Sequence, residues 1–545
     1  MAPRRMHARR GWLHPVRAHG KLRAGDAGDA RVMQENEHAE VVAFLSDPSV
    51  HGTDVEVART HGALVFLAGD RAYKLKRDIA YDYMDFSTPE RRRAMLQREL
   101  DLNRPHAPEI YHDLVAVTRG PDGGLALDGP GDPVEWVLRM RRFPAQAELA
   151  EVARRGGIDA ALAARIGRVV AGYHADAPRA GVDHGAARIG RIVADILGSL
   201  AQMDDVLDAD AVTDLRAKTD AALGRVGGLL DARAAAGFVR RCHGDLHLGN
   251  LVLIEGRPVP FDALEFDERL ATIDVLYDLA FLLMDLMHVD LRPAANAVLG
   301  HYLAHADEPA HHDGLAALPL FLALRAAIRA MVAVQRARLA DDPAEGEAAA
   351  RDYLTEAGAC LAPPRPVLVA VGGLSGSGKT TLAAGIAPGI GAAPGAVHLR
   401  SDIERKVMFG VDPLEKLPAE GYGPDVSARV YARLRERAER ALRAGHAVVL
   451  DAVHDIETER AAAAAVAARA GVPFHGLWLE AEPQALIERV SARRGDASDA
   501  DADVVRHQLA GAPDTVEWHM VDASGTAQAT LANARAVLGA VLTWP

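Results

Sequence analysis

Hydrophobic and polar positions alternate along the chain with two different periods, which divide it into parts. Residues 36–143 carry short apolar runs, and in GALVFLAGDRAYKLKRD two of them are joined at Gly69–Asp70, as in a β-hairpin. Further runs, YHDLVAVTRG and EWVLRMRRF, follow the helical pattern of TPERRRAMLQRELDLNR, and EHAEVVAFLSD predicts a helix before the hairpin. We therefore expect a first lobe, at about 34–143, in which a small sheet is accompanied by a helix.

The period lengthens after residue 143, and from about 144 to 362 it predicts an alanine-rich, helical second lobe. Two stretches interrupt the helices: HGDLHLGN, and LVLIEGRPVPFDALEF, which alternates like a hairpin that turns at Glu255–Gly256. The nearest approach to a long apolar run, VLYDLAFLLMDLMHVDL, contains Asp278 and Asp285. Because both charges would lie in the hydrocarbon, we expect a buried helix and no membrane span.

Three prolines in LAPPRPV end the helical lobe, since proline can continue neither a helix nor a central strand. Beyond them the apolar strands VLVAVGG, AVVLDAV and FHGLWLE alternate with helices, which predicts a parallel sheet wrapped by helices over residues 363–545. At the other end, residues 1–33 are basic and lack an apolar segment, so we expect a disordered tail. A targeting or nucleic-acid-binding arm is the alternative.

Composition narrows the class of protein. The chain has 545 residues, 49% of them hydrophobic and 25% charged, as in a globular protein of several domains. Its formal net charge of −13 disfavours binding to long nucleic acid and favours small substrates, including cationic ones. Only Cys242 and Cys360 are present, which argues against a disulfide framework, excludes a cysteine metal cluster and favours the cytoplasm. The oligomeric state stays open.

The stretch HGDLHLGN places Asp245 between two histidines and Asn250 five positions later. His243, Asp245 and His247 could form a metal cage, but their spacing converges only in an extended strand. Asp and Asn also serve as turn or cap residues. The third explanation is phosphoryl transfer, which needs a carboxylate at the acceptor hydroxyl and oxygen ligands for Mg2+. The predicted hairpin favours this explanation because it returns Asp262 to the loop.

This arrangement resembles the aminoglycoside phosphotransferase and choline kinase branch of the protein-kinase-like fold, in which H-G-D is followed by N and by an aspartate after the next hairpin. The resemblance implies that Asp245 is the catalytic base. It implies that Asn250 and Asp262 bind Mg2+, and that a lysine of the first lobe binds the ATP phosphates. AYKLK offers Lys74 for this role, with Lys76 on the same face of the strand as the alternative.

The same resemblance implies that Glu99 orients the lysine, an ordinary surface glutamate being the alternative. It also implies that Asp278 braces the second lobe. Two features depart from the family: Gly62 stands alone where a glycine-rich loop would cover the phosphates, and no acidic cluster for an aminoglycoside is identified. The sequence therefore defines the reaction type better than the acceptor.

A second nucleotide motif lies in VLVAVGGLSGSGKTTLAAGIA, where an apolar strand leads into a G-x-x-x-x-G-K-T loop and then into a helix. Its glycines allow backbone N–H groups to face phosphates, and the helix N-terminus adds partial positive charge. Lys379 would bridge the outer phosphates and Thr380 would bind Mg2+. The predicted nucleotide-binding residues are Gly373, Ser375, Gly376, Ser377, Gly378, Lys379, Thr380 and Thr381.

This region is compact and resembles the polynucleotide kinase, zeta-toxin and gluconate kinase group of P-loop kinases. The resemblance implies Asp402 as the base at the acceptor hydroxyl, Arg405 as a substrate contact and Asp451 as a carboxylate at Mg2+. It also implies a closing lid, on which a helix carries arginines to the transferring phosphate: Arg489, Arg493 and Arg494. The alternatives are a helix cap for Asp402, a turn residue for Asp451 and a solvated arginine face.

Together these features predict a multidomain kinase that uses ATP and Mg2+. The expected fold is a two-lobed, protein-kinase-like α+β domain at 34–362, followed by an α/β P-loop domain with a parallel sheet at 363–545. The whole chain resembles fusions of these two kinds of domain, and both would phosphorylate hydroxyl groups of small molecules. In one alternative a single module is catalytic and the other is a pseudokinase or a nucleotide-dependent switch. In another, the P-loop module phosphorylates 5′-hydroxyl ends of nucleic acid.

Overall fold

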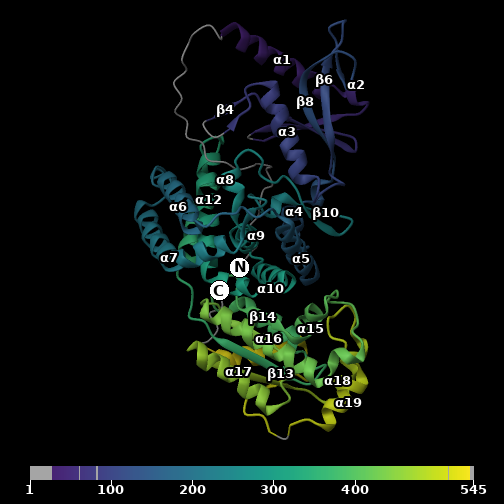
Figure 1. Cartoon of the computed structure of the whole chain (residues 1–545), viewed down its shortest axis with the longest axis vertical. Coiled ribbons are helices and arrows are strands. Elements are labelled where there is room, and N and C mark those ends of the chain that lie inside the picture. Colours follow the sequence, from purple (N-terminus) through teal and green to yellow (C-terminus); the bar gives the residue numbers. More distant parts are fainter. Residues whose placement is uncertain (1–27, 61, 82–83, 514, 540–545) are drawn as a thin grey trace.

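The computed structural model describes residues 28–539 except 61, 82–83 and 514, so most of the predicted basic tail lies outside the described residues (Figure 1). Helix α1, Gly28–Ser46, begins about eight residues before the first helix predicted from the sequence. Residues 28–33 are therefore helical, and the prediction of a disordered tail is wrong for them. Figure 1 shows three parts stacked along the long axis: a small lobe, a helical lobe and a domain with a parallel sheet.

The small lobe contains a six-stranded antiparallel sheet in the order β1-β2-β3-β8-β6-β7. The predicted hairpin is confirmed, with its turn at Gly69–Asp70. Helix α3 begins at Pro89 because Thr88 accepts a hydrogen bond from the Arg91 N–H, and its Leu96 is fully buried. The other elements are α2 Pro48–His51, β1 Val55–Arg59, β2 Ala63–Ala68, β3 Arg71–Lys76, β4 Ala80–Tyr81, β5 Met84–Asp85, α3 Pro89–Asn103, β6 Tyr111–Arg119, β7 Leu125–Leu127 and β8 Asp132–Arg141.

The helical lobe surrounds α9, Val275–His288, which is buried over its first twelve residues. The predicted hairpin β10–β11 turns at Glu255 and Gly256, whose φ angles of 52° and 77° are those of the tight turn that suits twisted strands. The remaining elements are η1 Ala145–Ala147, α4 Leu149–Arg154, α5 Ala160–Asp176, α6 Gly185–Leu200, α7 Ala209–Ala235, β9 Val239–Arg241, η2 Leu248–Asn250, β10 Leu251–Ile254, β11 Arg257–Pro260, α8 Glu268–Ala271, β12 Thr272–Asp274, α10 Arg292–Ala306, α11 Pro309–Gly314, η3 Leu315–Ala317, α12 Leu318–Ala337 and α13 Ala344–Cys360.

One helical stretch, Pro309–Ala337, is long and apolar enough to cross a membrane by length and composition. However, 78% of its most apolar window is buried inside the protein, as in a core helix. This stretch follows α9, the helix that the sequence pattern singled out, and α9 is buried as predicted.

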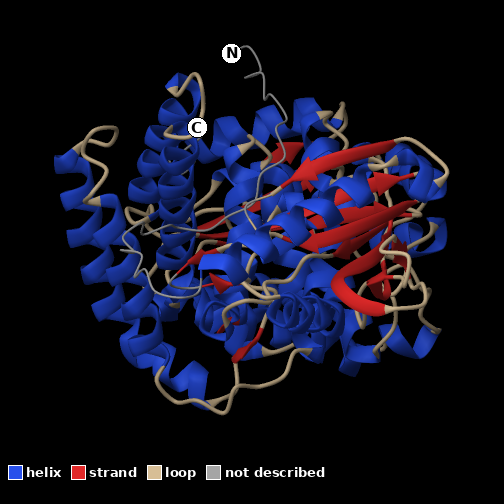
Figure 2. Ribbon diagram, turned by 90° about the horizontal axis from the view of Figure 1, so that it is seen from above, coloured by secondary structure: helices blue, strands red, loops and turns tan. Residues whose placement is uncertain are grey.

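The third part has a five-stranded, all-parallel sheet in the order β14-β15-β13-β16-β17, which confirms the predicted parallel sheet. Seen down the long axis, the strands lie mainly toward one side of the molecule with helices around them, and the other side holds helices and loops (Figure 2). The fold class predicted for both halves is confirmed. The elements are β13 Leu368–Gly373, α14 Lys379–Ile386, η4 Ala387–Gly389, β14 Val397–Arg400, α15 Ser401–Phe409, η5 Ala419–Tyr422, α16 Pro424–Arg443, β15 Val448–Asp451, α17 Glu457–Ala470, β16 Phe474–Glu480, α18 Pro483–Ala492, α19 Ala502–Ala510, β17 His519–Asp522 and α20 Ala527–Leu538.

The helical lobe and the parallel-sheet domain share one hydrophobic core, in which Val298 of α10 and Val397 of β14 belong to the same cluster. Polar contacts surround it. Asn296 donates to the Ala396 carbonyl at 2.9 Å, and the His446 ring donates to the Leu315 carbonyl at 3.1 Å. The shared core holds the two domains as one body, because separating them would expose apolar side chains of both.

Arg233 and Asp274 form a buried, two-contact ion pair in the helical lobe, at 2.7 and 2.8 Å, and are 2% and 4% exposed. We expect Asp274→Ala to lower the free energy of unfolding by about 3–5 kcal/mol, because it leaves the Arg233 charge buried without its partner. Asp214, which pairs with Lys218 on the surface of α7, is the control. Asp214→Ala should cost less than about 1 kcal/mol in the same urea titration. Equal shifts in the two variants would contradict the prediction.

Candidate functional site

Asp278 of α9 fixes the backbone of the loop 243–250 by hydrogen bonds. Its carboxylate accepts hydrogen bonds from the backbone N–H groups of His243 at 3.1 Å and Gly244 at 2.9 Å. Gly244 has a φ of 85°, which favours glycine, and a Cβ there would approach Leu264 and Ala271 at 3.1 Å. Asp278 is therefore the structural brace that the sequence predicts, and it fixes the backbone from which Asp245 projects.

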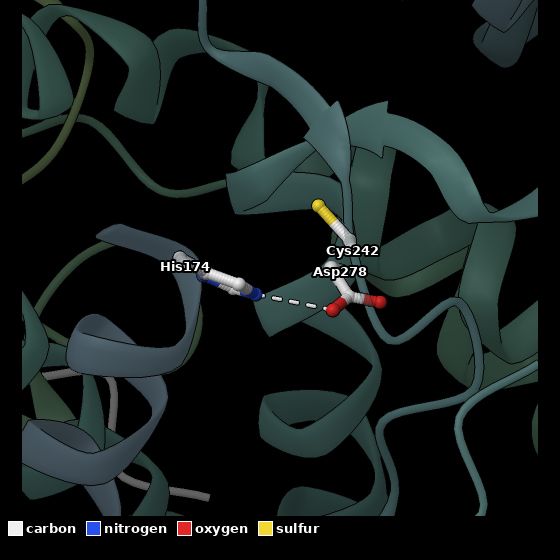
Figure 3. A group of neighbouring side chains, drawn as sticks. All are labelled: His174, Cys242 and Asp278. Atoms are coloured by element: carbon white, nitrogen blue, oxygen red, sulfur yellow. Dashed lines mark hydrogen bonds and ion pairs between the residues drawn. The ribbon is translucent and has the colours of Figure 1, made fainter. Parts of the chain in front are cut away.

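Figure 3 shows His174, Cys242 and Asp278, whose ligand-type atoms lie within 4.8 Å of one another. The His174 ring bonds to Asp278 at 3.1 Å through Nε2 and to the Tyr302 hydroxyl at 3.0 Å through Nδ1. Burial raises the pKa of the Cys242 thiol well above its ordinary value, so the sulfur stays protonated. Because both ring nitrogens are already paired and the thiol is neutral, this group acts as part of the brace and not as a metal site.

His243, Asp245 and His247 do not form a metal cage. The His243 ring pairs with the Phe261 carbonyl through Nε2 at 3.0 Å and with the Asp245 N–H through Nδ1 at 3.4 Å. His247 Nε2 lies 3.5 Å from the Asp245 carboxylate, and its Nδ1 accepts from the Gly249 N–H. The two imidazoles thus serve the backbone of the loop, which removes the metal-cage alternative.

Asn250 and Asp245 lie side by side. The Asn250 amide donates to the backbone carbonyl of Asp245 at 2.8 Å and to its carboxylate at 3.2 Å. Asn250 is fully buried, and its Oδ1 atom has no hydrogen-bond partner within the described part of the chain. A buried amide oxygen without a partner is costly unless a cation or water occupies the space beside it. Asn250 Oδ1 therefore fits the ligand role predicted from the sequence.

Five charged side chains, from β3, α3 and the segment after β11, meet between the two lobes. Lys74 of β3 donates to Glu99 of α3 at 2.6 Å and to Asp262 at 2.8 Å. Lys76, two residues along the same strand face, donates to Glu99 at 2.6 Å and to Glu265 at 2.6 Å. Glu99 is therefore fully buried and holds both lysines, and the alternative of a surface glutamate is wrong.

The electrostatics of this cluster keep the lysines charged. Burial would discharge Lys74, but Asp262 and Glu99 raise its pKa well above the ordinary value. Burial also opposes the charge of Glu99, yet Lys74 and Lys76 lower its pKa to about 2. For Asp262, burial and the neighbouring carboxylates of Glu99 and Glu265 raise the pKa to about 6. The cluster is thus rich in oxygen ligands beside a fixed positive charge.

Asp262 follows β11 with a φ of 61°, and two contacts hold this backbone in place. The Tyr111 hydroxyl accepts from the Asp262 N–H at 2.9 Å, and Asn103 accepts from the Ala263 N–H at 2.8 Å. Asp262 and Asn250 carry the oxygen types that Mg2+ prefers, so the residues present fit that ion. Sequence reasoning missed Tyr111 and Glu265, because only the folded chain brings them to this place.

The glycine loop joins β13 to α14 as predicted. A Cβ on Gly373 would lie 2.7 Å from the Leu479 carbonyl oxygen, and one on Gly376 would lie 2.5 Å from that of Leu486. Ser377 Oγ is buried and lacks a hydrogen-bond partner among the described residues. Lys379 donates to the Leu374 carbonyl at 2.9 Å. The loop also contains the predicted Ser375 and Gly378, while Thr381 is an exposed residue of α14.

Asp451, at the end of β15, is the centre of a polar group beside this loop. It accepts from Thr380 at 2.7 Å, and the His398 ring nitrogen lies 3.3 Å from it. Burial would raise the pKa of Asp451, but His398 and its other cationic neighbours lower it to about 2. The Asp451–Thr380 contact is the pair of oxygen groups expected to share a Mg2+ ion in a P-loop site.

Asp402 lies in the first turn of α15, directly after β14. Burial raises its pKa, and Asp451 adds to this effect while Arg400 and Lys379 oppose it. The charges of Asp402 and Asp451 thus act on Lys379, as expected for groups around one phosphate site. The role of Asp402 as a base at the acceptor hydroxyl stays a prediction.

The predicted arginine lid differs from expectation. Helix α18 ends at Ala492, so Arg493 and Arg494 follow the helix and do not lie on it. Arg489 donates to the carbonyls of Ser524 and Gly525, whereas the charge of Arg493 acts on Lys379 and lowers its pKa. Of the three predicted lid arginines, Arg489 and Arg494 thus donate to backbone carbonyls, and only Arg493 has an electrostatic effect on Lys379 of the phosphate loop.

Arg405 has a different role from the one predicted, and Gln508 makes a contact that was not predicted. Arg405 is buried and donates to the Gly421 carbonyl at 2.7 Å, so it supports the chain instead of facing a substrate. Gln508 of α19 accepts from the Ser375 N–H at 2.8 Å. This contact, which the sequence did not indicate, ties the segment after α18 to the glycine loop.

Residues 368–515 match the protein family described as AAA domain. This match confirms the predicted P-loop domain. Over 488 residues the chain is 29% identical to uncharacterized proteins of Mycobacterium tuberculosis and Mycobacterium bovis, covering 88% of this chain and 94% of each relative.

Two solved structures illustrate the similarity of each part of the chain to known proteins. A choline/ethanolamine kinase family protein from Mesorhizobium loti is 16% identical, with 60% of this chain and 99% of that chain covered and a TM-score of 0.37. A gluconokinase from Sinorhizobium meliloti 1021 is 22% identical, with 32% and 94% covered and a TM-score of 0.24.

Proposed function

We propose that the protein is a cytoplasmic, ATP-dependent phosphotransferase with two separate sites, each of which phosphorylates a hydroxyl group of a small molecule. The observation that carries this proposal is the group formed by Lys74, Glu99 and Asp262 beside Asp245 and Asn250. It combines a fixed cation, two oxygen ligands and a carboxylate, which are the parts that phosphoryl transfer requires.

At the N-terminal site, Lys74 would bind the phosphates of ATP while Glu99 holds its ammonium group in place. Mg2+ bound by Asn250 and Asp262 would supply positive charge to the same phosphates. Asp245 would accept the proton of the acceptor hydroxyl as its oxygen bonds to the γ-phosphorus and ADP leaves. The 6% exposure of Asp245 limits competition by bulk water.

At the C-terminal site, the backbone of the glycine loop and Lys379 would bind the phosphates. The adjacent Thr380 and Asp451 would bind Mg2+. Asp402 would take the proton of the second acceptor, and Arg493 would approach the transferring phosphate. Burial raises the pKa of Asp402, which makes its carboxylate a better proton acceptor.

The test is to incubate the protein with Mg2+, ATP and a metabolite extract and to follow phosphate-mass gains. We expect Asp245→Asn and Lys379→Ala each to eliminate a different subset of products, because each removes one site's essential group. Asp214→Asn and Lys218→Ala change the same residue types on the exposed face of α7 and should preserve every product.

The outcomes separate the alternatives. Products that survive Asp245→Asn but vanish with Lys379→Ala would make the N-terminal domain a pseudokinase, and the reverse pattern would make the P-loop domain a nucleotide-dependent switch. Transfer to an added 5′-hydroxyl oligonucleotide would assign the second site to nucleic-acid ends. If neither change affects any product, the proposal of two kinases is wrong.

A further inference from the structure

Arg400 is a cation of the parallel-sheet domain that the sequence did not single out. It is the last residue of β14, and in the sheet it lies opposite Asp451, the last residue of β15. Because the strands are parallel, both side chains project from the edge of the sheet at which β13 leads into the glycine loop. Arg400 therefore lies beside the phosphate loop, although it belongs neither to the glycine motif nor to the predicted lid.

The guanidinium of Arg400 lies between two carboxylates. Its Nε atom is 3.7 Å from Asp451 Oδ2, and its Nη2 atom donates to Asp496 Oδ1 at 3.1 Å. The same Asp451 oxygen accepts from the Thr380 hydroxyl at 2.7 Å. A single carboxylate thus separates Arg400 from the threonine that directly follows the lysine of the glycine loop.

The donors of Arg400 are only partly used. Its Nε atom is buried and has no hydrogen-bond partner among the described residues, because 3.7 Å is too long for a hydrogen bond. A buried donor without a partner is costly unless a ligand or water accepts from it. Nε and the adjacent amino group form a planar edge that matches two oxygens of one phosphate. Asp496 fills only one of the two positions on that edge.

Asp496 can give up Arg400 at little cost. It belongs to the segment 493–501 between α18 and α19, and its side chain is 32% exposed. Its Oδ1 atom also accepts from the Ser498 N–H at 2.9 Å, a contact within the same turn that does not need the arginine. Partly exposed ion pairs contribute little to stability, so a more highly charged phosphate can replace this carboxylate on the guanidinium.

Transfer of a phosphoryl group spreads negative charge over its peripheral oxygens, which a guanidinium is shaped to stabilise. We propose that Arg400 contacts the terminal phosphate of ATP at the C-terminal site and stabilises its charge during transfer, with this phosphate in the place of Asp496. The inference rests on the proposed function of that site. It assigns to the end of a strand a role that the sequence gave only to the lid arginines.

The reaction keeps its ordinary balance. The acceptor oxygen bonds to the γ-phosphorus, the bond from that phosphorus to the departing ADP oxygen breaks, and the hydroxyl proton passes to Asp402. Arg400 keeps its own proton and forms no covalent bond. Because its contact strengthens as charge spreads over the phosphate, its loss should lower kcat more than it weakens the binding of ATP.

The first test uses the full-length protein with Asp245→Asn, so that only the C-terminal site transfers label from γ-labelled ATP to a metabolite extract. At saturating ATP, Arg400→Gln should lower the rate by about 10²-fold. Arg469→Gln is the control, because it removes an arginine of the same domain that pairs with a carboxylate, Glu439, on the surface. The control should keep the rate of its parent.

Asp496→Asn separates a catalytic contact from a structural ion pair. If Arg400 only holds the segment 493–501 through Asp496, both variants should lose the same activity. We expect Asp496→Asn to keep the rate within about threefold of its parent, because the carboxylate is needed only to pair the arginine. Urea titrations establish that both variants are folded.

Nucleotide binding gives a readout that does not depend on turnover. Calorimetric titrations with Mg2+ compare ADP with AMP-PNP, the imido analogue of ATP, and the heat that is absent in Lys379→Ala reports the C-terminal site. Arg400→Gln should weaken AMP-PNP by about tenfold and ADP by less than about twofold, because ADP lacks the terminal phosphate that the guanidinium contacts.

Three results would each overturn the inference while the kinase function stands. They are a rate in Arg400→Gln within threefold of the parent, an equal loss of rate in Asp496→Asn, and the same change of affinity, or none, for both nucleotides. If Lys379→Ala removes neither labelled products nor any heat of nucleotide binding, the proposed function of the C-terminal site is wrong and the inference falls with it.

Discussion

Lys74→Met is expected to slow phosphate transfer at the N-terminal site by about 10²- to 10³-fold, the loss typical when one group that stabilises transition-state charge is removed. The ammonium of Lys74 bridges Glu99 and Asp262 at 2.6 and 2.8 Å, which directs it to the place where the phosphates would lie. Methionine keeps the length of the side chain but not its charge. The fold should persist because Lys76 still neutralises Glu99.

The measurement is kcat for the N-terminal site in a Lys379→Ala background, with Lys218→Met as the control for loss of a lysine charge on the surface. Lys76→Met distinguishes the two lysines of the strand. Lys76 pairs with Glu99 and Glu265 and has no contact with Asp262 among the described atoms, so its replacement should cost stability more than rate. If Lys76→Met abolishes transfer and Lys74→Met does not, the roles of the two lysines are reversed.

Features set by neighbours in sequence could be predicted from the chain alone. The turn at Glu255–Gly256 needs positive φ at both positions, and the pattern of apolar residues on either side already indicated a hairpin. The glycine loop before Lys379 is likewise a local structure, in which strand, loop and helix follow one another directly. For the same reason Asp402 was placed after its strand from the residue order alone.

Features set by distant parts of the chain could not be predicted. Glu265 meets Lys76 across 189 residues, and nothing in the stretch FDALEF distinguishes it from a surface glutamate. The end of α18 at Ala492 was also missed, because arginine is a good helix former and the residue types do not indicate that the backbone becomes extended at Arg493.

Six histidines, five buried and one half-buried, lead to a second large effect, which concerns stability. Burial lowers the pKa of each of them to between about 2 and about 4, below the ordinary value of 6.5: His243, His301, His311, His312, His446 and His454. Below pH 6.5 the unfolded chain therefore binds protons that the folded chain excludes. Stability is fully present above this pH and falls as the pH is lowered toward 4.

Acidification from pH 7 to pH 5 is therefore expected to destabilise the protein by several kcal/mol, since each such histidine contributes up to about 1.4 kcal/mol per pH unit. Urea titrations at half-unit steps of pH measure this slope. His312 is fully buried, and burial, Arg437 and Arg440 lower its pKa to about 3 against the effect of a backbone hydrogen bond with Pro309. His312→Leu should therefore reduce the slope by about one proton. A slope that is zero between pH 6.5 and 5, or unchanged in His312→Leu, would show that these rings are not excluded from protonation in the folded protein.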